Sequence, residues 1–284
     1  MKQTGAGGPP RQNVTPETAT NHPDYHTHTS FSCDSQASME AICEAALREG
    51  MQEIAITDHA DFEPLDFCCG HFRPTDYWQA IRRCRDLFEG RLIIRAGVEC
   101  GEAHLYQQEV AAVLSADEYD FVLGSLHWAD GRPTFDGVFF DGLDLDEGLV
   151  LYFDASTHLA AEGDYDVLAH PDIIRRAVYH RFGLVELDLA PHEARVRRML
   201  RIVAERGKGL EVNTAPRRRG MGEPGPSAQV LSWFWEEGGR IVTLGSDAHR
   251  PESVGADFDR AVAIARQAGI ERFATFERRR VAGW

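Results

Sequence analysis

The chain has 284 residues, 43% of them hydrophobic, and a formal net charge of −15 at pH 7. This length suits one catalytic domain of α/β barrel size, and the negative charge opposes non-specific binding to nucleic acid and anionic membranes. No stretch approaches the roughly 20 consecutive apolar residues that a membrane-spanning helix needs, which excludes a membrane protein of that kind.

The chain begins with a polar segment, residues 1–22, that is rich in Gly, Pro, Thr and Asn. It lacks the apolar run of a secretory signal and can bury little surface, so we expect a disordered tail. Residues 23–284 are expected to form one domain. The six cysteines stand at irregular positions without a CxxC pair, which favours reduced thiols and a cytoplasmic location.

From Asp24 onward, short β-like runs alternate with amphipathic helical stretches, the first of them at residues 39–49. The gaps are long enough for crossover helices, which implies parallel strands in either a barrel or a doubly wound sheet. Residues 272–280 are a possible late strand followed by a basic end. Seven strands are expected, at residues 24–28, 53–57, 92–98, 121–125, 167–169, 210–213 and 241–245.

Nearly every expected strand ends in a side chain that can bind a metal or a phosphate. In a parallel barrel the carboxyl ends of the strands form one rim, where the loops build the active site. A doubly wound sheet would gather fewer of these side chains in one crevice, so the pattern favours the barrel. The residues are His26, His28, Asp58, His59, Glu99, His127, His170, Asn213, Asp247 and His249.

Two pairs at i and i+2 spacing indicate a metal site: His26 with His28, and Asp247 with His249. Alternate residues of a strand point to the same side, so the two side chains of each pair can bind one cation. Imidazole and carboxylate ligands suit zinc, manganese or iron, whereas magnesium and calcium prefer oxygen alone. A single histidine is usually structural, but this set exceeds the four ligands of one tetrahedral ion, so we expect two or three divalent transition metals. Such a cluster activates water and stabilises charge at phosphorus, which fits hydrolysis of a phosphate ester.

The chain also contains a series of motifs that resembles one known family. In order, these are HTHTSFSCDS, TDHADF, AGVECG, GSLHWADG, AHPD, LEVNT and GSDAH. They resemble the PHP-domain histidinol-phosphatases over roughly residues 24–280. The resemblance implies a distorted, TIM-like (β/α)7 barrel with a metal site at the carboxyl ends of its strands. It also implies hydrolysis of L-histidinol phosphate to L-histidinol and phosphate in histidine biosynthesis.

The resemblance implies a role for each ligand position. The first metal would be held by His26, His28, Glu99 and Asp247, and the second by Glu99, His127 and His170. The third would use His59, His249 and Asp34, a position where many relatives carry histidine instead. Asp58 is expected to orient a ligand rather than bind metal.

The family also implies arginines that bind the substrate phosphate. The candidates are Arg175, Arg176 and Arg217, with Arg218 and Arg219 as alternatives. A guanidinium matches phosphate oxygens with two parallel hydrogen bonds, although neighbouring arginines are often only solvated surface charges. The expected reaction is in-line attack by a metal-bridging hydroxide, without a covalent phosphoenzyme. Asp247 or His249 would relay the proton.

Two other functions fit the same pattern. One is a phosphoesterase of the same scaffold that acts on another small ester or on a nucleic-acid end, because fold and metals do not fix the substrate. The net charge weighs against nucleic acid. The other is a binding module without catalysis, which the complete set of metal-competent side chains disfavours. We expect a small-molecule substrate, no nucleic-acid or membrane partner, and make no prediction of the oligomeric state.

Overall fold

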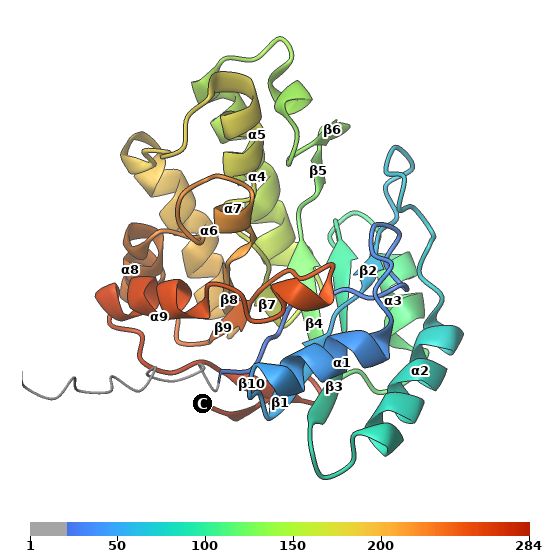
Figure 1. The fold of residues 1–284 in the computed structure, drawn as a ribbon. Helices are drawn as coiled ribbons and strands as arrows, with labels where there is room; N and C mark the ends of the chain where they lie inside the picture. Colours follow the sequence, from blue (N-terminus) through green and yellow to red (C-terminus); the bar gives the residue numbers. More distant parts are fainter. Residues whose placement is uncertain (1–21) are drawn as a thin grey trace, which may run out of the picture.

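The computed structural model describes residues 22–284, so the expected N-terminal tail lies outside the described residues except at its last position. At the centre lies a curved parallel sheet surrounded by helices (Figure 1). In order across the sheet, its strands are β1 (Glu53–Ile56), β3 (Ile93–Gly101), β4 (Phe121–Ser125), β7 (Val167–Leu168), β8 (Gly209–Asn213) and β9 (Val242–Gly245). The short β2 (His59–Ala60) continues beside β3.

The extended segment 24–28 closes this sheet into a barrel. On one side Tyr25 N donates to Leu244 O at 2.9 Å, and on the other Ala55 N donates to Asp24 O at 2.9 Å. Parallel bridges pair Asp24 with Ile54 and Thr27 with Ala248. The segment therefore occupies the seventh strand position of the expected (β/α)7 barrel, although it forms isolated bridges instead of a continuous strand.

The central strands are buried on both faces, as in parallel sheets that are covered by helices. All residues of β4 and β8 are buried, and only the first residues of β3 reach the surface. The strand expected at 92–98 continues to Gly101, because residues 97–101 pair in register with 121–125 of β4. Glu99 therefore lies inside a strand, and pairing with the neighbouring strands fixes the position of its backbone.

The helices cover the outside of the barrel. Helix α6 shows why they form, because Val196, Met199, Leu200 and Val203 recur at helical spacing and are all buried. The expected helix at 39–49 is confirmed as α1. The helices are α1 (Met39–Arg48), α2 (Pro74–Leu87), α3 (Gln107–Leu114), α4 (Leu145–Glu162), α5 (Ile174–Phe182), α6 (Glu193–Glu205), α7 (Ala215–Arg218), α8 (Ala228–Glu236) and α9 (Phe258–Gln267). Within residues 22–284, none has the length and apolar character needed to cross a bilayer.

Short hairpins complete the fold at both ends of the barrel. The expected late strand is an antiparallel hairpin of β10 (Thr275–Glu277) and β11 (Arg280–Gly283), which lies below the barrel in Figure 1. Ala274 N donates to Val242 O at the start of β9, so this hairpin covers the amino ends of the strands. The other hairpin, β5 (Trp128–Ala129) with β6 (Arg132–Pro133), follows β4 at the opposite end. The carboxyl ends of the strands are thus free to form a site.

Candidate metal centre

The carboxylate of Glu99 lies at the centre of a group of five histidines. Glu99 projects from β3 near the carboxyl end of the strand, and its side chain is completely buried. The histidines come from segment 24–28, from β2 and from the loops after β4 and β7. The shortest distances from a ring nitrogen to a Glu99 oxygen are 3.2 Å for His26, 3.6 Å for His28, 3.0 Å for His59, 3.4 Å for His127 and 2.8 Å for His170.

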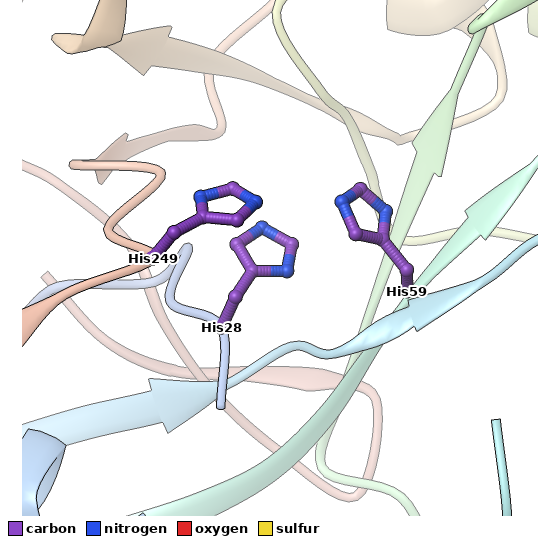
Figure 2. Close-up of side chains that lie close together, drawn as sticks. All are labelled: His28, His59 and His249. Atoms are coloured by element: carbon purple, nitrogen blue, oxygen red, sulfur yellow. The ribbon is translucent and has the colours of Figure 1, made fainter. Parts of the chain in front are cut away.

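Two further acids and one histidine extend this group toward the pocket mouth. Asp247 Oδ1 lies 3.3 Å from His28 Nε2, and His249 Nε2 lies 2.9 Å from Asp34 Oδ2. Figure 2 shows the rings of His28, His59 and His249 around one shared space. All nine expected metal-binding residues therefore lie together, although they come from segments as distant as residues 26 and 249.

Charge pairing within the group keeps its acids ionised. Burial alone would raise the pKa of Glu99, but the charges on His26, His59 and His127 hold it well below the usual range. Asp247 is only partly buried. Burial would raise its pKa, but its contacts with His28, His26 and His249 keep that pKa well below normal. By contrast, burial and the neighbouring His249 and His59 hold the pKa of His28 well below 6.5, so its imidazole is neutral and can bind metal.

The donor atoms of this group fit divalent metal ions. His26 Nε2, His28 Nε2, His59 Nδ1 and Glu99 Oε2 are all buried without a hydrogen-bond partner among the described residues. Orphaned buried polar atoms are costly, and a shared cation would satisfy them. Ligand atoms lie within 4.8 Å of one another in four trios, and these are His28–His59–His249, His26–His28–Asp247, His26–Glu99–His170 and His59–Glu99–His127. Because the trios share members, the donor set fits neighbouring ions with common ligands.

Buried side chains around this group hold the histidine rings in position. Glu211 Oε1 lies 2.6 Å from His26 Nδ1, and its other oxygen accepts from the backbone N of His170 at 2.7 Å. Asp61 Oδ1 lies 3.1 Å from His127 Nδ1. Such contacts leave the opposite ring nitrogen free to bind metal. Sequence reasoning missed both acids, although Glu211 could have been found because it shares a strand face with Asn213.

Asp58 acts on the group through a neighbouring hydroxyl. Its carboxylate accepts from Ser32 Oγ at 2.7 Å and from the backbone N of Thr29 at 2.6 Å. Ser32 Oγ lies 3.0 Å from His28 Nδ1 and accepts from the backbone N of His59 at 3.0 Å. Through Ser32, Asp58 therefore lies next to two of the histidines, and its expected orienting role stays a prediction.

Two arginines face the pocket above the histidines. The pocket has a cavity volume of about 190 Å³ and is lined by Arg176 and Arg219 together with Asp34, Phe135 and Asp247. The guanidinium of Arg176 lies 5.5 Å from the centre of the Phe135 ring. Burial and the charge of Arg219 lower the pKa of Arg176. Within residues 22–284 neither arginine forms a side-chain hydrogen bond or ion pair, so both remain available to an anion.

The other candidate arginines are engaged elsewhere. Arg175 donates to Asp172 at 3.1 Å and to the backbone O of Met221 at 3.1 Å, and it does not line this pocket. Arg217 pairs with Asp257 at 2.7 Å on the surface. Arg218 donates to Thr214 and to the backbone O of Ser246.

A disulfide joins two loops at the edge of this pocket. Cys33 and Cys68, which are 35 residues apart, are bonded, and their Cα atoms lie 5.3 Å apart. The expectation that all six cysteines are reduced thiols is therefore wrong for this pair. Irregular sequence spacing cannot reveal which cysteines meet, because folding brings the two loops together. The remaining cysteines, Cys43, Cys69, Cys84 and Cys100, are free.

Comparisons with known proteins point to one family. The model of the PHP domain matches residues 24–215. A "Histidinol-phosphatase" of Lactococcus lactis subsp. lactis (strain IL1403) is 27% identical over 260 residues, covering 89% of this chain and 93% of that protein. A "Probable histidinol-phosphatase" of Deinococcus radiodurans is 28% identical over 265 residues, covering 91% of this chain and 97% of that protein.

A solved structure has the same fold. The crystal structure of histidinol phosphate phosphatase from Lactococcus lactis subsp. lactis, complexed with zinc, L-histidinol and phosphate, superposes with a TM-score of 0.82. The match has 24% sequence identity and covers 93% of this chain and 99% of that chain. At this identity the likeness concerns the architecture, which is the closed parallel barrel described above.

Proposed function

Because this chain belongs to the PHP domain family, we propose that it hydrolyses L-histidinol phosphate to L-histidinol and phosphate with bound divalent metals. Support comes from the Lactococcus lactis relative, which carries the name histidinol-phosphatase, and from the related crystal structure that holds zinc, L-histidinol and phosphate. The single observation that carries the proposal is the position of Arg176 and Arg219, both unpaired within residues 22–284, over a cluster of histidines and acids.

The ligand set of the proposed metal centre has nine members, with Glu99 shared between ions. One ion would lie between His26, His28, Glu99 and Asp247, and a second between Glu99, His127 and His170. A third would lie at the pocket mouth between His59, His249 and Asp34. The trio His26–His28–Asp247 supports the first ion, and two trios that contain Glu99 support its role as a shared ligand. Contacts of Asp34 with His249 and His59 support the third. Imidazole and carboxylate donors favour zinc, manganese or iron.

The chain's own groups would orient the ester and move protons. Arg176 and Arg219 bind phosphate oxygens and hold the phosphorus over the cluster. When bound, the metals supply a water ligand of lowered pKa and offset negative charge on the phosphate. Asp247 accepts a proton from the attacking water, and His249 returns one to the leaving alkoxide, so water and ester become alcohol and hydrogen phosphate. No covalent phosphoenzyme forms.

The first experiment measures phosphate release from L-histidinol phosphate by the purified protein. Activity should disappear after chelation and return when zinc, manganese or iron is added separately. Rates for L-histidinol phosphate should exceed those for an aryl phosphate at equal concentration. If phosphate is released in a metal-dependent way only from other esters, the assignment of L-histidinol phosphate as the substrate is wrong. If the protein binds metal but cleaves no ester, the proposed hydrolase function is wrong.

Arginine variants test how the phosphate is bound. Arg176→Gln and Arg219→Gln should each raise KM for L-histidinol phosphate by about tenfold or more, because a charge-assisted hydrogen bond contributes roughly 1.5–3 kcal/mol. Bound metal, measured by elemental analysis, should not change. Arg217→Gln is the matched control and should retain wild-type KM, since Arg217 pairs with Asp257 away from the pocket. If Arg217→Gln raises KM more than the other two substitutions do, Arg217 and not Arg176 or Arg219 binds the phosphate.

A further inference from the structure

The Cys33–Cys68 disulfide lies at the pocket edge beside one proposed metal ligand. Cys33 directly precedes Asp34, whose carboxylate lies 2.9 Å from His249 Nε2 and 3.8 Å from His59 Nε2. Cys68 itself lines the pocket, together with Phe67. The crosslink therefore joins the turn that carries Asp34 to a second wall of the same pocket.

The second wall, segment 61–72, is anchored independently of this crosslink. Asp66 accepts from Trp128 Nε1 at 2.6 Å, and Glu63 accepts from the hydroxyl of Tyr106 at 2.8 Å. Between segments 29–37 and 61–72 of the described structure, no hydrogen bond or ion pair is formed. The sulfur–sulfur bond is thus the direct bond by which the anchored segment holds the turn that carries Asp34.

We propose that Cys33 and Cys68 form a reversible thiol–disulfide modification site that controls how tightly the metal at the pocket mouth is held. In the oxidised protein the crosslink fixes Asp34 against His59 and His249. In the reduced protein the turn that carries Asp34 keeps its hydrogen bonds through Ser32 and Ser35 but loses its covalent link to segment 61–72, so the preorganisation of that metal site falls. The proposal rests on the metal centre proposed above, but not on which ester is cleaved.

The oxidation step balances with a low-molecular-weight disulfide, such as glutathione disulfide, as the oxidant. Cys33 is half-buried whereas Cys68 is only 6% exposed, so the Cys33 thiolate attacks first and releases one glutathione. The Cys68 thiolate then attacks the sulfur of Cys33 in the mixed disulfide. This step forms the Cys33–Cys68 bond and releases the second glutathione, and the two cysteine protons pass to the two glutathione thiols.

The test measures thiols and metal, not turnover. The full-length zinc-loaded protein is incubated with glutathione disulfide or with a phosphine reductant, which is then removed under anaerobic conditions. Labelling after denaturation should count four free thiols in the oxidised protein and six in the reduced protein. Competition with a chromophoric chelator measures the affinity of the zinc ion that is lost first. This affinity should be about tenfold lower after reduction, a decrease similar to that caused by removing a group that supports a metal ligand.

Three variants separate this effect from a general effect of oxidation. Cys33→Ser and Cys68→Ser should bind this zinc ion as weakly as the reduced protein in both conditions, and circular dichroism checks that they fold. Cys69→Ser is the matched control, because Cys69 is the exposed free thiol next to Cys68, and it should keep the full response. Six labelled thiols after oxidation, or equal zinc affinity in the oxidised and reduced protein, would overturn the proposal. Either result leaves the test of phosphate release unaffected.

Discussion

At the scale of single residues, the site depends on a few buried acids that control many imidazoles. Glu99 alone contacts five histidines at 3.6 Å or less. A second buried acid, Glu211, fixes the ring of His26 from the opposite side at 2.6 Å. Burial lowers the pKa of His26, but the charges of Glu211 and Glu99 outweigh it and raise that pKa well above normal. These acids set both the orientation and the charge of the metal-binding face.

Glu211→Gln tests the orienting role. The amide keeps the shape of the side chain and can still accept a hydrogen bond from His26 Nδ1, but the negative charge is lost. We expect zinc affinity or kcat to fall by about 10-fold to 100-fold, the usual effect of removing a partner of a metal-binding histidine. Competition with a chromophoric zinc chelator gives the affinity, and phosphate release gives kcat.

The control for this variant is Glu271→Gln, because Glu271 is exposed and forms no side-chain hydrogen bond or ion pair within the described structure. It removes the same charge from the surface and should leave both values unchanged. Equal effects in the two variants would mean that the net charge of the protein, and not the contact with His26, determines zinc affinity.

At the scale of elements, the two ends of the described chain close the barrel together. Segment 24–28 fills the gap between β1 and β9, while the hairpin of β10 and β11 covers the amino ends of the strands. Tyr25 connects the two closures, since its hydroxyl accepts from the backbone N of Phe276 at 2.7 Å. Phe276 packs beside Phe121 in the barrel interior, with ring centres 4.9 Å apart. Tyr25 directly precedes His26 in the sequence, so the hairpin that covers the amino ends of the strands helps to position a residue of the site.

Phe276→Ala tests whether the hairpin stabilises the barrel. The phenyl ring is 3% exposed and fills the interior between Tyr25 and Phe121, so its removal leaves a cavity. The free energy of unfolding should fall by about 3–5 kcal/mol, as for other buried phenylalanines. Urea unfolding followed by tryptophan fluorescence measures this change. Trp284→Ala, at a 57% exposed side chain near the same hairpin, should change it by less than about 0.5 kcal/mol.

At the scale of the whole molecule, the acidic chain places six of its 12 histidines in the barrel mouth. The net charge is −15, yet Arg176 and Arg219 stand without acidic partners beside the cluster within the described residues. Bound cations would add further positive charge at the same place, so the local field can favour an anionic ester despite the negative total. Local charge therefore decides the class of ligand better than the net charge does.

Removal of metal should destabilise the folded protein as a whole. Ligands that bind only the native state stabilise it by RT ln(1 + [L]/Kd), about 2.7 kcal/mol at 100 times Kd. We expect Tm to fall by several degrees after chelation and to recover with zinc in proportion to the logarithm of its concentration. Differential scanning calorimetry at several zinc concentrations measures this dependence. A Tm that does not respond to zinc would contradict a metal centre that forms part of the native core.

Some features of the molecule follow from local sequence alone. The parallel strands, the helix at residues 39–48 and the gathering of His26, His59, Glu99 and Asp247 at one end could all be predicted. Hydrophobic periodicity and the position of polar residues at strand ends are local patterns, and parallel strands must bring their carboxyl ends together. The β-hairpin at residues 275–283 is only partly predictable from the sequence, since a short terminal strand carries little periodic signal.

The tertiary structure decided which particular side chains face the pocket. Sequence reasoning included Arg176 but also chose Arg175 and Arg217, because the direction of an arginine in a loop or short helix depends on its packing. It also missed Asp61, Glu211 and the pairing of Cys33 with Cys68. The sequence by itself thus determined the type of fold and the kind of ligand atoms. Only folding decided the partners, because distances between residues far apart in the chain are set by how the barrel closes.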